Sequence, residues 1–138
     1  YDSFENLLEA RVQAQLGAEG LVELAVGNAR LVARDARRQP GERVMVSIRA
    51  GDIILSLDVP PRTSARNIVP ATVQDIHLTD SRVLVYADLG VCLVAEITAS
   101  ALRELSLRQG QTVYLIIKAN SILVLDAPEQ PLLHERRP

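Results

Sequence analysis

A series of short apolar segments that occurs twice along the chain constrains the fold more than any other feature. Each segment either alternates apolar and polar residues or runs through Val, Ile and Leu for five to seven residues, with Gly, Asp or Asn at its boundaries. Such segments are typical of short β-strands. The predicted strands span residues 10–16, 21–26, 29–34, 43–48 and 53–57 in the first half, and residues 71–78, 82–88, 91–97, 112–117 and 122–125 in the second half.

The two halves also match each other in sequence, which indicates an internal duplication. The offset between matching residues grows from 61 near the start of the halves to 69 near their ends. The increase comes from an extra segment of the second half, residues 98–108, in which Thr98 can cap a short helix. The first half crosses the same place with a polar loop over residues 35–42. The matched segments are 3–12 with 64–73, 41–44 with 110–113, and 48–50 with 117–119.

Five short strands in each half predict two small barrels, because closing a sheet on itself removes its exposed edges. Only 3% of the residues are aromatic and there is no Trp, so the core must consist of Val, Leu, Ile and Ala. We therefore expect an all-β fold of two tandem five-stranded barrels, with a short helix in the second barrel. The expected division is a first barrel over residues 1–58, a proline-containing linker over 59–63, a second barrel over 64–126 and a mobile tail over 127–138.

Composition excludes several classes of function. A net charge of −2 with scattered basic residues argues against nucleic-acid binding. The lone cysteine, Cys92, cannot form a disulfide framework and favours a reducing, cytoplasmic compartment, and we expect it to be a small buried residue. No apolar run is long enough to span a membrane, and there is no signal peptide. The two histidines, His77 and His134, do not suggest a metal site.

Two polar segments of the second half could together bind a tetrahedral oxyanion. One lies before its first strand, and the other lies at the turn between its last two strands. They supply hydroxyls, a side-chain amide, two cations and backbone N–H groups at a turn, and no carboxylate. A fully deprotonated oxyanion has only acceptors, so its site needs donors and no competing negative charge. The candidate oxyanion-binding residues are Ser64, Ala65, Arg66, Asn67, Lys118, Ala119, Asn120 and Ser121, with Ala65 and Ala119 acting through their backbone N–H groups.

These same residues resemble a known family. The run Ser64-Ala65-Arg66-Asn67 is similar to the opening signature of the molybdate-binding Mop, or TOBE, module. The run Lys118-Ala119-Asn120-Ser121 is similar to the closing signature, with Asn120 where a small Ser or Thr is more usual. Two matches about fifty residues apart, within a duplicated five-strand unit, are more specific than either match alone. The resemblance covers residues 4–126.

Within this family, the first half and the bridge over residues 48–57 look most like the C-terminal part of a molybdate importer's ATP-binding subunit. That resemblance implies tandem OB-like barrels that pair as a homodimer and bind molybdate or tungstate near the interfaces, with no further cofactor. It also implies a regulatory role, in which the domain senses intracellular molybdate and restrains import. The parent protein would carry a nucleotide-binding domain upstream and associate with a membrane permease at the inner face of the cell membrane. This chain contains no Gly-rich phosphate loop, so we expect it not to be an enzyme.

The first copy departs from the signature in a way that predicts a lost site. It has Glu5 where the second copy has Arg66, and Asp52 where the second copy has Ser121. Each change places negative charge where an oxyanion would bind, and like charges a few ångströms apart repel by about 1–4 kcal/mol. We therefore expect only the second copy to bind an oxyanion.

Plainer interpretations remain open from the sequence alone. Residues 64–67 could be only the polar start of a strand, Lys118 an ordinary lysine at a strand end, and Arg37-Arg38 a solvated loop. The chain could also be a freestanding cytoplasmic molybdate-storage protein, or the effector domain of a molybdate-responsive transcription regulator. A fourth possibility is a TOBE module that serves docking or dimerisation without any ligand.

Overall fold

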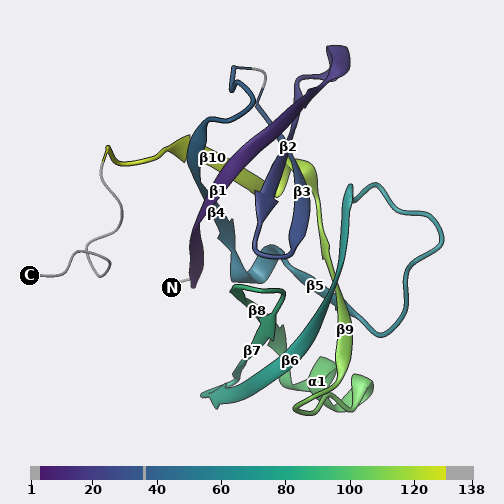
Figure 1. Ribbon diagram of the computed structural model, residues 1–138. Coiled ribbons are helices and arrows are strands. Elements are labelled where there is room, and N and C mark those ends of the chain that lie inside the picture. The colour runs from purple at the N-terminus through teal and green to yellow at the C-terminus, as the bar shows by residue number, and fades with distance from the viewer. Residues whose placement is uncertain (1–3, 36, 130–138) are drawn as a thin grey trace, which may run out of the picture.

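The chain folds into two five-stranded antiparallel sheets that lie end to end, as the computed structural model shows for residues 4–35 and 37–129 (Figure 1). The all-β architecture with two five-stranded units is therefore confirmed. Residues 130–138, most of the predicted tail, lie outside the described residues. The first sheet has the order β10 (Ile122–Asp126), β4 (Arg43–Arg49), β1 (Glu5–Leu16), β2 (Leu21–Val26), β3 (Ala29–Arg34), and the second has the order β5 (Ile54–Ser56), β9 (Thr112–Ile117), β6 (Asn67–Thr79), β7 (Arg82–Asp88), β8 (Cys92–Thr98).

The predicted helix is present in the second half. Helix α1 (Ala99–Leu105) follows β8, and Thr98 caps it by accepting a hydrogen bond of 3.0 Å from the Ala101 N–H through its Oγ1. The described part of the loop over residues 35–42 contains no helix. The described residues also contain three short 3₁₀ turns, namely η1 (Gly17–Glu19), η2 (Ala50–Asp52) and η3 (Ala119–Ser121).

The two sheets do not follow the sequence halves, because the last strand of each half joins the sheet of the other. Strand β5 leaves the first half after η2 and pairs with β9, and β10 leaves the second half after η3 and pairs with β4. β5 and β10 occupy matching positions in the duplicated sequence, so each can take the edge position that the other would have in the sheet of its own copy. The sheets therefore differ from the contiguous division into residues 1–58 and 64–126 that we expected, and the segment between β5 and β6 connects two strands of one sheet.

The first strand of each copy is longer than predicted. β1 begins at Glu5 and β6 at Asn67, and each strand pairs with two partners in succession. β1 pairs first with β4 and then with β2, with a bulge between Val12 and Ala14 where the partner changes. β6 likewise pairs first with β9 and then with β7. Pro70 obscured the start of β6 in the sequence, but it lies where β6 pairs with β9 alone, and a strand with one open side accommodates a residue that lacks an N–H.

The core consists of aliphatic side chains from both sheets, as the lack of aromatic residues predicts. Alternation places every second residue of β2 and β7 inside. Cys92 is exposed, so the prediction that it is a small buried residue was wrong. The alternation along β8 turns Leu93 and Ala95 into the core and leaves Cys92 outside. The fully buried large side chains include Val12, Val22, Leu24, Leu31, Ile48, Ile53, Leu93, Leu115 and Ile117.

Two buried asparagines join the sheets at matching positions. Asn6 of β1 is 5% exposed, and its Nδ2 donates to the carbonyls of Val94 and Ile48 at 2.9 and 3.1 Å. Its Oδ1 accepts from the Val94 N–H at 2.8 Å. The amide therefore pairs with β8, the edge strand of the other sheet, as a neighbouring strand would, and leaves no buried polar group unsatisfied.

Asn67 of β6 makes the three matching bonds, from the second copy to the first. Its Nδ2 donates to the carbonyls of Val32 and Ile117 at 2.9 and 3.1 Å, and its Oδ1 accepts from the Val32 N–H at 2.6 Å. Val32 lies on β3, the edge strand of the first sheet. Each copy thus covers one open edge of the other with a side-chain amide.

Two hairpin turns meet tightly between the sheets, and glycine makes this contact possible. The Asn28 N–H donates to the Leu89 carbonyl at 2.7 Å. A Cβ on Gly27 would lie 2.6 Å from the Leu89 carbonyl oxygen, and a Cβ on Gly90 would lie 2.7 Å from Cγ of Asn28. Both glycines also have positive φ, at 58° and 93°. The β2–β3 and β7–β8 turns can therefore pack only if both positions lack a side chain.

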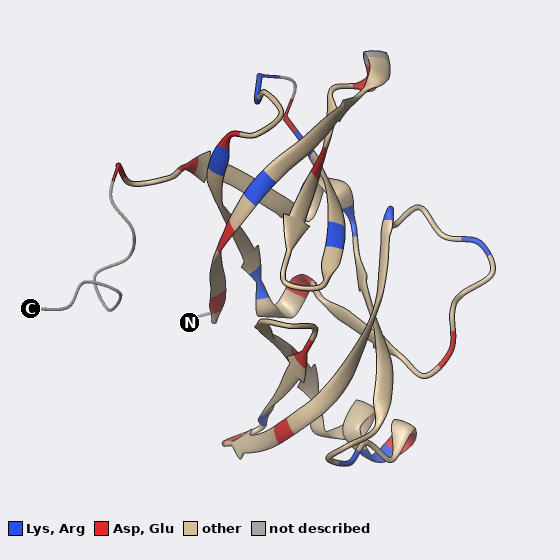
Figure 2. Cartoon of the chain, viewed as in Figure 1, with Lys and Arg blue, Asp and Glu red and all other residues tan. Residues whose placement is uncertain are grey.

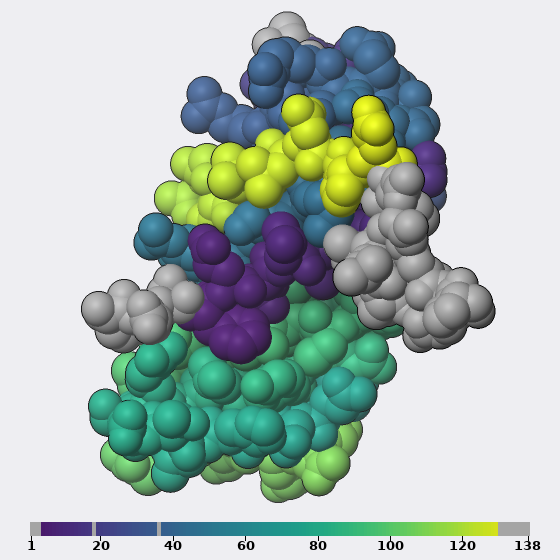
Figure 3. All heavy atoms as spheres, turned by 90° about the vertical axis from the view of Figure 1, so that its left-hand side faces the viewer, coloured from purple at the N-terminus to yellow at the C-terminus, as the bar shows by residue number. Residues whose placement is uncertain are grey.

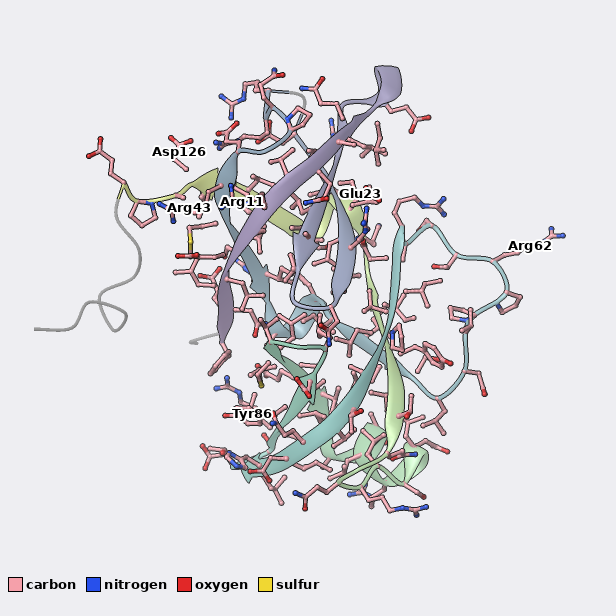
Figure 4. All side chains as sticks on the ribbon, viewed as in Figure 1. Arg11, Glu23, Arg43, Arg62, Tyr86 and Asp126 are labelled. Atoms are coloured by element: carbon pink, nitrogen blue, oxygen red, sulfur yellow. The ribbon has the colours of Figure 1, made fainter. Side chains whose placement is uncertain are left out.

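Arg38 fastens the exchanged strand β10 to the first half. The Arg38 side chain is 9% exposed and donates to three carboxylates, at 3.1 Å to Asp35, 3.0 Å to Glu42 and 2.6 Å to Asp126. Asp126 ends β10, at the same edge of the molecule as Arg43 (Figure 4). The prediction of a solvated Arg37-Arg38 loop was therefore wrong for Arg38, because a carboxylate of the second half completes its set of acceptors.

The Arg38 cluster also affects ionisation. Burial of the Asp35 carboxyl opposes its ionisation, but hydrogen bonds from the Arg37 N–H and from Arg38 outweigh burial and hold the pKa of Asp35 below its usual value. The interaction of Asp35 with Arg38 therefore stabilises the folded protein above the unfolded pKa of about 3.9, and this contribution is lost as the pH falls through the lowered folded value.

Replacing Asn6 by alanine should lower the free energy of unfolding by about 2–4 kcal/mol, because the N–H and the carbonyl of Val94, on the edge strand β8, would remain buried without their partner. Urea unfolding followed by circular dichroism measures this. Asn120→Ala is the matched control, since Asn120 is exposed, and should change stability by less than about 0.5 kcal/mol. Equal stabilities of the two variants would contradict this role for Asn6.

Replacing Arg38 by alanine should lower the free energy of unfolding by about 2–4 kcal/mol at neutral pH, since Asp35 would remain buried without its cation. The difference from the parent chain should shrink as the pH falls below about 4. Arg37→Ala, at a residue whose side chain is 82% exposed, should cost less than about 0.5 kcal/mol. A difference between the parent and Arg38→Ala that does not depend on pH would rule out the Asp35 pair as its source.

Candidate functional site

The two polar segments predicted to bind an oxyanion come together in a hollow of about 310 Å³ at the junction of the sheets. The loop between β5 and β6 forms one wall, and the turns η2 and η3 form the floor. In Figure 1 this loop projects from the body of the molecule. Residues from both copies line the hollow, namely Gly51, Asp52 and Ile54 from the first copy and Thr63, Ser64, Ala65, Ile116, Lys118 and Ser121 from the second copy.

The η3 turn is held by buried alanine and isoleucine on either side of its polar residues. Ala119 is 8% exposed and Ile122 is 3% exposed, and the Ser121 N–H donates to the Lys118 carbonyl at 3.0 Å. Burying these apolar residues leaves Lys118 and Ser121 to line the hollow. In the first copy, the Ala50 N–H donates to the Phe4 carbonyl at 2.8 Å, whereas the Ala119 N–H has no corresponding bond to Ala65 within the described chain.

The hollow offers one cation and three hydroxyls. Lys118 is exposed, and it forms no ion pair among the described residues. Ser64 and Ser121 line the hollow beside it. The Oγ1 of Thr63 accepts a hydrogen bond of 3.1 Å from the Ala65 N–H, which leaves the Thr63 hydroxyl proton available to a ligand. The Ala65 N–H, which we predicted as a ligand donor, is already used in that bond.

Four predicted ligands do not line this hollow, namely Arg66, Asn67, Ala119 and Asn120. Arg66 folds back on its own loop, where Nη2 donates to the Thr63 carbonyl at 2.6 Å, and it lines a neighbouring hollow with Pro60 and Pro61. Both amide hydrogens of Asn67 are donated to carbonyls, so Asn67 has none left for an oxyanion. Asn120 is exposed on the turn but does not line the hollow. Arg62, at the same projecting loop, points away from the body of the molecule (Figure 4).

Several lining residues were not predicted, and Asp52 matters most among them. The sequence suggested a site without a carboxylate, but the exchange of β5 carries η2, and Asp52 with it, to the site of the second copy. Asp52 and Ser121 hold matching positions of the two turns and line the same hollow. The alignment of the copies identified this pair, but only the topology brings the two residues together.

The matching cation of the first copy is paired with a carboxylate. Arg49, which corresponds to Lys118, has its Nε 4.0 Å from a carboxylate oxygen of Glu5, which corresponds to Arg66. Acidic and basic residues are interspersed over both sheets (Figure 2). Lys118 therefore differs from Arg49 in having no carboxylate within ion-pair distance in the described chain.

No other grouping in the described residues suggests metal chemistry or a membrane span. His77 contacts Asp75 at 2.9 Å and lies against the ring of Tyr86, and this contact, with a backbone bond from Ile76, lowers the pKa of Asp75. No three His, Cys, Asp or Glu side chains gather as metal ligands would within residues 4–35 and 37–129, and His134 lies outside them. None of the described helices is long and apolar enough to cross a membrane.

A family comparison identifies the part of the chain that carries this hollow. Residues 63–124 match the model of the TOBE domain. The chain contains a TOBE domain. The match begins at Thr63 and ends two residues before β10 does, so it includes all the lining residues of the second copy.

Curated relatives of the chain are ATP-binding proteins of molybdenum and tungsten import. The molybdenum import ATP-binding protein ModC of Vibrio parahaemolyticus is 29% identical over 134 residues, which cover 91% of this chain and 36% of that protein. The molybdate/tungstate import ATP-binding protein WtpC of Pyrococcus horikoshii is 36% identical over 129 residues, 89% of this chain and 37% of that protein. ModC of Haemophilus influenzae is 36% identical over 104 residues, 75% of this chain and 30% of that protein. The chain thus spans about a third of the length of these relatives.

A solved structure matches the whole arrangement of two sheets. The cytoplasmic molybdate-binding protein ModG, crystallised with molybdate bound, superposes with a TM-score of 0.78 at 26% sequence identity. The match covers 88% of this chain and 96% of that chain. The resemblance to tandem molybdate-binding modules is therefore confirmed at the level of the fold.

Proposed function

We propose that this chain is the oxyanion-binding regulatory portion of a molybdate importer's ATP-binding subunit. The observation that carries the proposal is the hollow itself, in which Lys118 and the hydroxyls of Thr63, Ser64 and Ser121 meet. Molybdate and tungstate are the ligands that fit this proposal best, since the relatives and the matching structure are named for their transport or binding.

The hollow would bind an oxyanion through donors alone. The Lys118 ammonium would provide the charge, and the three hydroxyls would each turn a proton toward an oxygen of the ligand. The Ala119 N–H, at the start of the η3 turn, would add a backbone donor. Arg66 would need to leave the Thr63 carbonyl before it could reach the ligand, so we assign the charge to Lys118 first.

Such a site would regulate import if it is part of the longer importer subunit. In the parent subunit, oxyanion bound on the cytoplasmic side would report that the cell is supplied, and the loaded domain would restrain the ATPase and its membrane permease. A binding module can do this only if the ligand favours one arrangement of the subunit over another. The chain itself would perform no catalysis.

Storage of molybdate by a freestanding protein is a second candidate. The match to 96% of the ModG chain favours it, because ModG is a binding protein in its own right. The amino-acid sequence that precedes Tyr1 in the full-length protein distinguishes the two proposals. A Gly-rich phosphate loop followed by Lys and Ser or Thr in that sequence would support the importer subunit. An initiating Met directly before Tyr1 would support storage.

A homodimer is part of the proposal, and an apolar patch on the first sheet supports it. Leu7 and Leu123 flank Ser47 in register on the outer face and are 58% and 59% exposed, and Leu125 lies two residues further along β10. Figure 3 looks onto the side where β10, β4 and the start of β1 adjoin. Exposed apolar side chains gathered on one face favour association. The matching row of the second sheet includes Ile54 and Ile116, which border the hollow.

Lys118→Ala should weaken molybdate binding by about ten- to a hundredfold, because a charge-assisted hydrogen bond contributes about 1.5–3 kcal/mol. Ser121→Asp should abolish binding and leave the fold intact, since Asp52 shows that the matching turn accommodates an aspartate. Arg49→Ala, at the matching position of the first copy, should change binding little. Calorimetric titration of the variants measures this, and a loss of binding by Arg49→Ala alone would place the site in the other copy.

The chain should sediment as a dimer at micromolar concentrations. Leu123→Lys should shift it toward monomer, because a charge within the patch would lose its hydration in the interface. Leu78→Lys is the matched control, since Leu78 is 65% exposed and lies on the second sheet. A monomeric parent chain with and without molybdate would disprove dimerisation, and an equal effect of both variants would disprove the patch.

A further inference from the structure

We infer that Asp52 limits the oxyanion affinity of the hollow, so that the site fills only at high ligand concentration. The inference rests on the proposed function, because it assigns a role within the same site. Asp52 belongs to the first copy, whose own oxyanion signature is lost, and it would act on the ligand bound by the second copy.

The fold holds Asp52 in place at the hollow. Asp52 ends the η2 turn, which connects β4 of the first sheet with β5 of the second. Its neighbours Ala50 and Ile53 are 0% and 2% exposed, and the Ile53 N–H donates to the Ala50 carbonyl at 3.2 Å. Because the turn is anchored in both sheets and flanked by buried residues, the backbone of Asp52 is held at the hollow.

The charge of Asp52 is also uncompensated within the hollow. Asp52 forms no ion pair and no side-chain hydrogen bond among the described residues, and Lys118, the single cation that lines the hollow in that part of the chain, is not within ion-pair distance. A bound dianion would therefore meet one positive and one negative side chain. Asp52 is exposed to solvent, so screening reduces this repulsion without removing it.

The Asp52 carboxylate also cannot form a hydrogen bond with the ligand. A fully deprotonated oxyanion has only acceptors, and an ionised carboxylate has only acceptors, so no hydrogen bond can form between them. An asparagine of the same shape would offer an amide donor. Asp52 thus opposes binding both by charge and by hydrogen bonding, and a weakened site suits a sensor that should restrain import only after the supply is sufficient.

Calorimetric titration of the purified chain with sodium molybdate tests the inference in three variants. Asp52→Asn should bind molybdate about tenfold more tightly than the parent chain at low salt, which corresponds to about 1.4 kcal/mol, and the gain should shrink at high salt. Asp52→Glu, which keeps the charge, should show no gain. Asp58→Asn is the matched control, because it changes the net charge equally at an exposed aspartate outside the hollow, and should alter affinity less than twofold.

The outcomes separate this inference from the proposed function. If Asp52→Asn binds no more tightly than the parent while Lys118→Ala still loses binding, the hollow is the site and Asp52 does not limit it. If Asp58→Asn gains as much as Asp52→Asn, the effect belongs to net charge and the inference fails. If neither the parent nor Asp52→Asn binds molybdate while both keep their folded circular dichroism spectrum, the proposed function and the inference fail together.

Discussion

The exchange of β5 and β10 between the two sheets determines how the two copies of the sequence pack together. Each sheet lacks a strand until the other copy provides it, so neither half of the sequence forms a complete unit alone. The amides of Asn6 and Asn67 secure this arrangement, because each pairs with the backbone of an edge strand in the opposite sheet. Glycines at the meeting hairpins allow the same close approach. The molecule is therefore one interlocked body made from two copies.

The candidate site is a consequence of this interlocking. Its floor consists of the two turns that precede the exchanged strands, so a residue of each copy lies in the same hollow. Lys118 and the hydroxyls come from the copy that keeps the signature, whereas Asp52 comes from the copy that has lost it. A duplication that merely placed two modules in tandem would have kept these charges apart.

Duplication also allowed the copies to specialise without losing the common framework. The second copy carries α1 where the first carries the loop that contains Arg38, and Arg38 holds β10 through Asp126. The first copy pairs Arg49 with Glu5, whereas Lys118 has no such partner in the described chain. The two asparagines, and the buried alanine and isoleucine on either side of each turn, are the same in both copies. The differences that matter for the hollow lie in the polar residues around it, and the largest difference in length lies in the connection before the fourth strand of each copy.

Most of the strands, the duplication, the helix after β8 and the family could be predicted from the amino-acid sequence, because strand alternation, capping and matched residues are local or periodic signals. The sequence also identified Ser64, Ala65, Lys118 and Ser121, which do line one hollow. It could not determine which sheet β5 and β10 join, since the two strands match each other and local pattern does not distinguish their partners. Asn67 was predicted as a ligand, but its amide binds backbone carbonyls, and Arg38 was predicted as solvated, but it is buried. Asp52 was considered only within the first copy, whereas it lines the hollow together with residues of the second copy. Local sequence patterns could not predict these points, because each depends on contacts between residues that are far apart in the chain.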